Sequence, residues 1–466
     1  MAEIKVFQLF RRGSRLKKPS LRLSILSLII GLFSFQPVSA EFGSIVDIGF
    51  AGDFYFTNEN ANNGQGYVNL LMQNKWSDSI LWIDVGAGGL IGDTATSYVK
   101  APQIYYRMGK RNEMRLTVGR ALHDWSFADD NWDMGLTQPL FKWNQARPEE
   151  QGLFGVFFTY PILKNKFEFT AFASPIFVPS QGPSYELTNG KITSSNPWFN
   201  EPVQVLDLSG NKVDLSFDVD VPKAQDVLLQ ESYGLQFATP QNKRDFLLNV
   251  FALDKPRNDL VLPFQGQLNL TTLDGDISIQ PVVPRHQVIG TDIGWNFRRF
   301  KTTFSYLYES KVEYDAPEGT FFPIIPEQHI YSVDQLIRIS RNQRISFAYI
   351  KVDRNENQIG GDTTGAQVTA FAARNRFEEA ARVKWQSLLL KRKGVYRINT
   401  SLAYTQSLFR DNAWISTDIR WSINKGLEAY SQCDFFGGSE NQIEALDFIS
   451  TYQNNDRCLI GGHYAF

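Results

Sequence analysis

The last ten residues of the chain, 457–466, alternate between two kinds of side chain. Counted back from the C-terminus, one face carries Phe466, Tyr464, Gly462, Ile460 and Cys458, and the other carries Ala465, His463, Gly461 and Leu459. A period of two residues places alternate side chains on opposite faces of a β-strand. We therefore expect the chain to end in a strand with one apolar, aromatic face.

The same period recurs along the chain from residue 41 onward. Apolar side chains alternate with charged and small ones over residues 46–56, 396–404 and 415–423. This pattern is hard to place in a β-sandwich, but it suits a closed wall with lipid outside and water inside. Lipid offers no partner to an unpaired backbone group, so such a wall must have no free edge. The sequence thus predicts an all-β fold, a transmembrane antiparallel β-barrel.

The connections between the expected strands alternate in length. Short turns are expected at 77–78, 109–112, 163–166, 240–243, 298–300, 341–343, 390–394 and 424–426. Mostly longer, polar connections are expected at 57–65, 92–98, 121–151, 175–230, 254–286, 312–327, 355–371, 410–412 and 437–455. Short periplasmic turns and long extracellular loops are typical of such barrels, as is an even strand number. The pattern predicts about eighteen strands, with sixteen as an alternative; residues 215–221 could add a further strand or form a surface hairpin.

The first forty residues have a different character. Basic residues are frequent in 1–22, an apolar run occupies 23–35, and small residues end the segment at Ala40. This order is typical of a secretory signal peptide, and a run of about 13 residues is short for the roughly 20 that a spanning helix needs. We expect cleavage after Ala40 and a mature barrel of residues 41–466. An N-terminal membrane anchor is the alternative.

Composition agrees with this class and excludes another. Aromatic residues make up 14% of the chain, and the mean hydropathy is −0.27, as a polar lumen inside a lipid-facing wall should give. Without residues 1–40, the 47 basic and 49 acidic residues of the chain fall to 40 and 48, a net charge near −8. A nucleic-acid partner would require a basic face, so we expect none.

The terminal strand, the strand pattern and the N-terminal segment together resemble porin-type barrels of the Gram-negative outer membrane. In that family the C-terminal strand is the signal read by the barrel-assembly machinery, and Phe466 and Tyr464 would carry it here. The resemblance implies outer-membrane lipid around the barrel, small hydrophilic solutes inside it, and a homotrimer. Nothing in the sequence points to a cofactor or a metal.

If the apolar faces point outward, the other face of each strand lines the lumen. Basic side chains gather there on the later strands: Arg338, Arg344, Arg376, Arg382, Lys384, Arg397 and Arg420. The first and penultimate strands instead carry Asp47, Asp53, Glu428 and Asp434. Both strands flank the terminal strand in a closed barrel, so the acids should cluster apart from the basic strip. Such opposed charges would act on passing solutes through a transverse field; alternatively, the charges simply pair with each other.

The connection 121–151 combines acidic residues with tryptophans. It contains Asp129, Asp130 and Asp133 close to Trp125 and Trp132. In general porins the third surface loop folds into the lumen and faces an arginine cluster. The resemblance therefore implies that the three aspartates are constriction residues, opposite arginines such as Arg376, Arg382 and Arg397. Two alternatives are calcium binding by the closely spaced oxygen ligands and an ordered surface loop with packed tryptophans.

The two cysteines, Cys433 and Cys458, fall on the outward face of the last two expected strands. They could face each other across a single hairpin, and their number suits an oxidising compartment. We predict a disulfide that closes the last surface loop. Two free, buried thiols are the alternative.

The histidines show no metal-ligand spacing, and no GxSxG motif is present, so we expect no enzyme. A barrel of about eighteen strands leaves room for an aqueous lumen. The sequence therefore favours a passive channel for small hydrophilic solutes. The alternatives are a substrate-selective conduit, for a sugar or an anionic polysaccharide, and a non-conducting surface or adhesion barrel.

Overall fold

The computed structural model describes residues 41–56, 63–75, 78–91, 93, 96–110, 113–163, 166–208, 210–240, 245–269, 271–312, 320–321, 325–354, 376–391, 397–408, 412–424, 426–438 and 448–466. The expected signal peptide, residues 1–40, lies outside the described residues. Among the helices of the described ranges, none is both long and apolar enough to cross a membrane.

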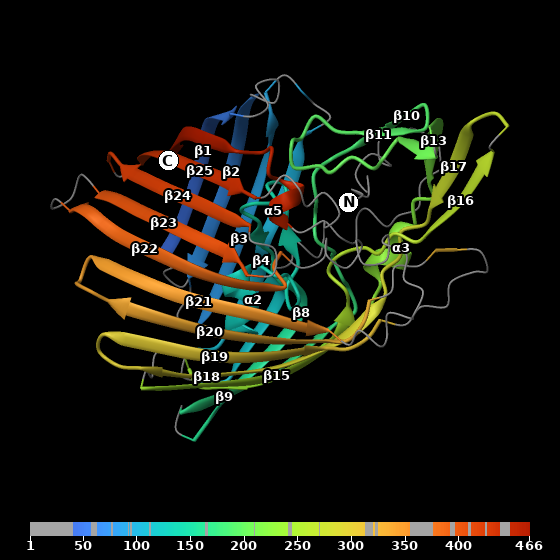
Figure 1. Cartoon of the computed structure of the whole chain (residues 1–466). Helices are drawn as coiled ribbons and strands as arrows, with labels where there is room; N and C mark the ends of the chain where they lie inside the picture. The colour runs from blue at the N-terminus through green and yellow to red at the C-terminus, as the bar shows by residue number, and fades with distance from the viewer. Residues whose placement is uncertain are drawn as a thin grey trace, which may run out of the picture.

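Eighteen strands pair into one closed antiparallel sheet (Figure 1). In order around the ring they are β1 (Glu41–Tyr55), β2 (Asn63–Lys75), β3 (Ser79–Leu90), β4 (Tyr98–Met108), β5 (Arg115–Ala121), β8 (Leu153–Ile162), β9 (Phe167–Ser174), β14 (Ser232–Ala238), β15 (Phe246–Pro256), β18 (Arg285–Asn296), β19 (Phe300–Glu309), β20 (Gln328–Arg338), β21 (Gln343–Arg354), β22 (Glu379–Lys391), β23 (Arg397–Ser407), β24 (Ala413–Ser422), β25 (Leu427–Gly437) and β26 (Arg457–Ala465). The last strand pairs with the first, from Asp47 opposite Ala465 to Tyr55 opposite Arg457, which closes the ring. The predicted all-β barrel of eighteen strands is therefore confirmed.

The two faces of the barrel wall differ in the side chains that they carry, because alternate residues of each strand point to opposite faces. In β8, Phe154, Val156, Phe158 and Tyr160 are exposed, while the residues between them are buried. Exposed apolar side chains recur at alternate positions of other strands, for example at Phe50 and Phe54 of β1. A soluble protein rarely exposes so many large apolar groups. An outer face in lipid and an inner face in water account for both patterns.

The two ends of the barrel differ as predicted. All eight short turns and all nine outer connections fall between the strands where the sequence placed them. Figure 1 shows the C-terminus at the short-turn end and the long connections projecting from the other end. The exit from β26 at the short-turn end follows from its antiparallel pairing with β25 and β1.

Two of the long connections, between β9 and β14 and between β15 and β18, combine into structure of their own outside the ring. β13 (Asn211–Val219) pairs with β12 (Val205–Leu208) and, in parallel, with β17 (Asp274–Ile279), which in turn pairs with β16 (Phe264–Asn269). Val213, Leu215 and Phe217 are buried in this small sheet. Residues 215–221 thus contribute to a surface sheet and add no strand to the barrel. The same region holds the short elements β10 (Glu186–Thr188), β11 (Lys191–Thr193) and α3 (Ala224–Leu228).

Candidate functional site: the barrel lumen

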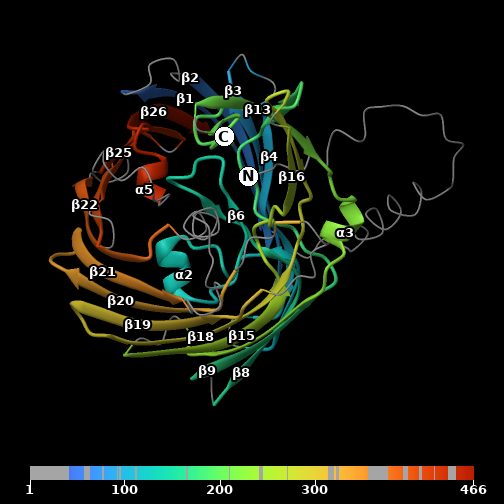
Figure 2. The ribbon, with the colours of Figure 1, turned by 45° about the vertical axis from the view of Figure 1, so that its right-hand side comes forward.

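The connection from β5 to β8 folds into the barrel. Its helix α2 (Phe127–Trp132) begins after Ser126, whose Oγ accepts a hydrogen bond from the Asp129 N–H at 3.3 Å. A serine in this position satisfies one of the backbone donors that a helix start leaves free. Figure 2 shows α2, and the short strand β6 (Leu140–Phe141) that follows it, inside the ring of strands.

Aromatic packing and hydrogen bonds fix α2 to one side of the wall. Trp125 and Trp132 have 0% and 2% of their surface exposed, in one apolar cluster with wall residues such as Phe251 and Ile330. The Trp132 indole donates to Ser332 Oγ on β20 at 3.1 Å. Further bonds run from Phe127 N to Asp292 Oδ2 on β18 (3.1 Å) and from Asn249 Nδ2 on β15 to Trp125 O (2.6 Å).

Ionic contacts fix the same connection to the other side of the lumen. Arg147 donates two hydrogen bonds of 3.0 Å to the carboxylate of Asp434 on β25, and a third, of 2.8 Å, to the backbone carbonyl of Thr417 on β24. Glu149 forms a salt bridge with Lys100 on β4. Residues 122–152 therefore cross the lumen and are anchored on both sides of it.

The expected constriction residues have three different environments. Asp133 forms a salt bridge with Arg376 at 3.1 Å. Asp129 does not face the arginines. It is 3% exposed, and its carboxylate accepts hydrogen bonds from the backbone N–H groups of Leu136 (3.0 Å) and Thr137 (2.7 Å). These oxygens stabilise the turn after α2, because buried backbone donors need acceptors.

Asp130 lies close to a second carboxyl group of the same connection. Burial, followed by the charge of Glu150 and other acids, raises the pKa of Asp130 to about 10. Burial and the neighbouring Asp129 raise the pKa of Glu150, in β7 (Glu149–Glu150), to about 7. Two carboxyl groups that share a desolvated site cannot both ionise easily. At neutral pH this pair retains a proton.

Arg382 also contacts the inward loop, but through a carbonyl rather than a carboxylate. Its Nη2 donates to Asn131 O at 2.6 Å, and its guanidinium lies 4.5 Å from the Trp132 ring centre. Arg376 and Arg382 therefore hold the end of α2. They do not stand free in the lumen.

The other four predicted arginines converge on one cavity, which we call the basic cavity. Its volume is about 650 Å³, and it lies at the short-turn ends of β20 to β24. The basic side chains that line it are Arg338, Arg344, Arg397 and Arg420, together with Lys384, Arg341 and Arg147. Among the described residues of its lining, Asp418 is the one acid. Arg147, Arg341 and Asp418 were not among the predicted site residues. Asp418 lies two positions before Arg420 in β24, and this alternation places both side chains on the lumenal face.

The predicted acids do gather where β1 and β25 flank β26, but the terminal strand supplies their partners. Arg457 lies between Asp53, at 2.5 Å, and Asp434, at 3.6 Å. We call this group the seam triad; each of its three side chains has at most 1% of its surface exposed. The acids of the seam are therefore partly compensated by a buried arginine and do not form a free acidic wall.

His463 has a corresponding role nearer the C-terminus of the same strand. Its Nδ1 lies 2.6 Å from Asp47 Oδ1, and its Nε2 lies 3.3 Å from Glu428 Oε1. The acids were predicted to lie in the lumen, whereas Arg457 and His463 were not among the predicted site residues. Both residues lie at lumen-facing positions of the last strand. The alternation of side chains in that strand was therefore the sequence signal that could have identified them.

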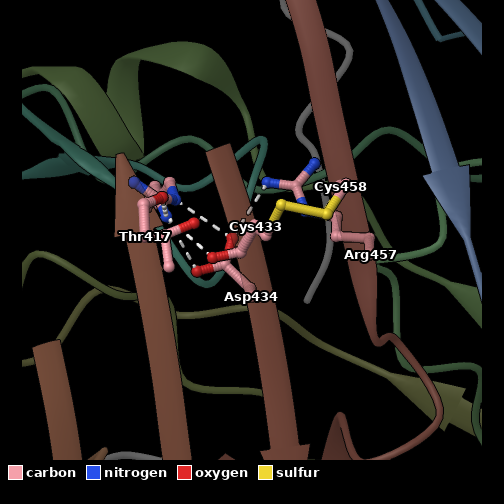
Figure 3. The surroundings of a disulfide bond; sticks show 6 residues. Thr417, Cys433, Asp434, Arg457 and Cys458 are labelled. Carbon is pink, nitrogen blue, oxygen red and sulfur yellow. Dashed lines mark hydrogen bonds and ion pairs between the residues drawn. A yellow bond between two sulfur atoms is a disulfide. The ribbon is translucent and has the colours of Figure 1, made fainter. Parts of the chain in front are cut away.

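A disulfide joins Cys433 and Cys458 on the outward side of the seam. The sulfur atoms are 2.01 Å apart, and the two cysteines are direct cross-strand partners in β25 and β26. The next pair in that register is Asp434 opposite Arg457. Figure 3 shows the disulfide on one side of these strands and the Arg457–Asp434 contact beside it.

The C-terminal aromatic residues lie on the outer surface. Phe466 is 71% exposed, its ring centre is 4.7 Å from that of Tyr464, and its N–H donates to Val46 O at 2.9 Å. The backbone of the last residue is thus still held by β1.

No family model and no curated protein sequence matches this chain. Several solved structures are similar to it. OccAB2 of Acinetobacter baumannii is 11% identical over 92% of this chain and 98% of that chain, with a TM-score of 0.47. OccK2 (OpdF) of Pseudomonas aeruginosa is 8% identical over 92% and 98%, also at 0.47, and a mutant of the Rh. blastica porin is 9% identical over 91% and 100%, at 0.38. Such low identity concerns the fold alone, and the closed ring rests on this chain's own strand pairing.

Proposed function

We propose that the protein is a channel of the Gram-negative outer membrane through which small hydrophilic solutes diffuse passively. The observation that carries this proposal is the closed ring of eighteen strands, with apolar side chains exposed outside and charged side chains inside. A ring of this size is too wide for wall side chains alone to fill. The inward connection 122–152 narrows the lumen and would set the size limit for solutes.

Purified protein in planar lipid bilayers tests the proposal. Stable, ohmic single-channel conductance in potassium chloride supports a passive channel. A correctly folded barrel that inserts without conducting would overturn the proposal and favour a non-conducting surface barrel. Passage of uncharged sugars of increasing size, measured by liposome swelling, would then give the cut-off imposed by the constriction.

A substrate-selective conduit is the second candidate, and the uneven charge of the lumen favours it. Arg457 and His463 lie beside the acids of β1 and β25, whereas the described lining of the basic cavity has seven basic side chains and one acid. Focused positive charge raises the local concentration of anions. Selectivity for chloride over potassium, from reversal potentials in a salt gradient, distinguishes this conduit from an unselective channel.

The route to the membrane belongs to the same proposal. We infer that residues 1–40 direct export and are removed, and that Phe466 and Tyr464 present the terminal strand to the barrel-assembly machinery. Mass spectrometry of protein from outer-membrane fractions should find Glu41 as the N-terminal residue. The homotrimer is likewise a proposal, which the mass of the detergent-solubilised channel tests.

A further inference from the structure

The basic cavity differs from the rest of the lumen in the state of its charges. Arg420 has a carboxylate partner, Asp418, at 3.0 Å, and Arg147 reaches the same carboxylate at 3.6 Å. Within the ranges that the structure describes, none of the other five cations forms an ion pair with a carboxylate: Arg338, Arg341, Arg344, Lys384 and Arg397. Five cations without a carboxylate partner among the described residues therefore line one cavity.

The strand register forces some of these cations together. Arg338 on β20 is the direct cross-strand partner of Arg344 on β21. Like charges in directly opposite positions destabilise a sheet, and a basic side chain from the turn, Arg341, lies in the same lining. The arrangement is unfavourable for the wall by itself, and an anion that spans several side chains would relieve the repulsion.

The remaining lining indicates which anions fit. Amide and hydroxyl groups such as those of Gln386, Asn399 and Ser401 alternate with the cations. Leu388 is the apolar residue among the described lining, and no aromatic ring lines the described part of the cavity. The surface therefore recognises charge and oxygen atoms and offers no ring on which a base or a sugar could stack.

We propose that the basic cavity binds small polyvalent oxyanions, that is, phosphate, pyrophosphate and the phosphate groups of small esters. A guanidinium donates two parallel hydrogen bonds to a planar or tetrahedral oxyanion. A polyvalent anion engages several guanidinium groups at once, whereas chloride engages one or two. The proposal deepens the channel function and rests on it, because a solute reaches this space through the lumen. It also predicts a sidedness, because the lining residues lie at the short-turn ends of the strands, the periplasmic end in the proposed function.

The experiment measures chloride current through single channels while pyrophosphate is added to one side. The salt concentration is kept near 0.1 M, because a Debye length of about 10 Å leaves these charges unscreened over the width of the cavity. We expect pyrophosphate to reduce the current at lower concentration from the short-turn side than from the long-loop side. Sulfate should act more weakly, and an equal concentration of acetate should have little effect.

Two double variants with the same charge change assign the site. The variant Arg344→Gln, Arg397→Gln removes two unpaired cations of the lining, and we expect the half-blocking concentration of pyrophosphate to rise at least about tenfold. The control, Arg298→Gln with Arg299→Gln, removes two cations from the neighbouring turn between β18 and β19, outside the lining, and should leave block unchanged. Circular dichroism and heat-dependent gel mobility verify that each variant is folded.

The possible outcomes distinguish failure of the oxyanion site from failure of the channel function. Pyrophosphate that leaves the wild-type current unchanged, or blocks the lining variant equally well, overturns the oxyanion site while the channel function stands. If the wild type conducts no ions, the channel function fails instead. Calorimetric titration of detergent-solubilised protein with pyrophosphate then tests the site directly, and binding that the lining variant retains would reject it.

Discussion

Arginine has opposite roles in two regions of this lumen. In the seam triad, Arg457 is fully enclosed between two carboxylates. In the basic cavity, Arg344 and Arg397 lie in an open space without a carboxylate partner among the described residues. The first arginine compensates buried carboxylates at the junction between the first and last strands, and the others leave positive charge exposed to solutes. The lumenal charges of this barrel therefore fall into two groups: charges that stabilise the wall and charges that can act on passing solutes.

The largest expected effect comes from removing Arg457. Arg457→Met leaves Asp53 and Asp434 buried with less compensation, and breaking a buried ion pair in this way costs about 3–5 kcal/mol. Urea unfolding of the barrel in detergent should show a loss of that size. The double variant Asp53→Asn, Arg457→Met should recover much of it, because Asp434 keeps its ion pair with Arg147. A single variant as stable as the wild type would contradict the structural role of the triad.

The disulfide beside the triad should have the next largest effect. Cys433→Ser with Cys458→Ser opens a covalent loop with a sequence separation of 25 residues. Loop-closure entropy for that length is worth up to about 3.5 kcal/mol. The measurement compares thermal unfolding of wild type and variant with and without dithiothreitol. Reductant should lower the wild-type midpoint toward that of the variant and leave the variant unaffected; identical midpoints throughout would mean that the bond adds no stability.

The seam also shows what sequence could and could not predict. Strand parity identified Asp53, Asp434 and the lumenal arginines, because the period of two is a local property of each strand. The partners of these residues depend on register between strands, and register is non-local: Asp53 and Arg457 are 404 positions apart in the chain. Counting only the predicted lumen-facing acids, without their cross-strand partners, therefore overestimated the acidity of the seam.

The loops illustrate the same limit. Their positions along the chain followed from the strand pattern, but the parts of the structure against which they fold did not. Asp129 was expected to face arginines, and its carboxylate instead accepts backbone hydrogen bonds within its own loop. Likewise, β13 and β17 come from two separate connections and pair in parallel. No local pattern in either segment specifies that pairing.

A pH change should loosen the inward loop by a smaller amount than either substitution. The pKa values of Glu150 and Asp130 are raised in the folded loop, to about 7 and about 10. The protonated forms are therefore the ones that the folded loop favours, and this stabilisation is complete in acid and is lost as pH rises through 7 toward 10. Single-channel current should fluctuate more at pH 9 than at pH 5. Glu150→Gln should flatten the profile between pH 5 and 8, whereas an unchanged profile would mean that other groups are responsible.

The smallest effect on stability should come from a cation of the basic cavity, although the charge removed equals that of Arg457→Met. Arg344→Met abolishes no ion pair with a described carboxylate, and it relieves the repulsion between Arg344 and its cross-strand partner Arg338. We expect the free energy of unfolding to stay within about 0.5 kcal/mol of wild type. The reversal potential in a potassium chloride gradient should nevertheless shift toward cations, since the focused positive charge falls. A stability loss comparable to that of Arg457→Met, with unchanged selectivity, would show that the cavity arginines stabilise the wall just as the seam triad does, and the division of lumenal charge into two roles would be wrong.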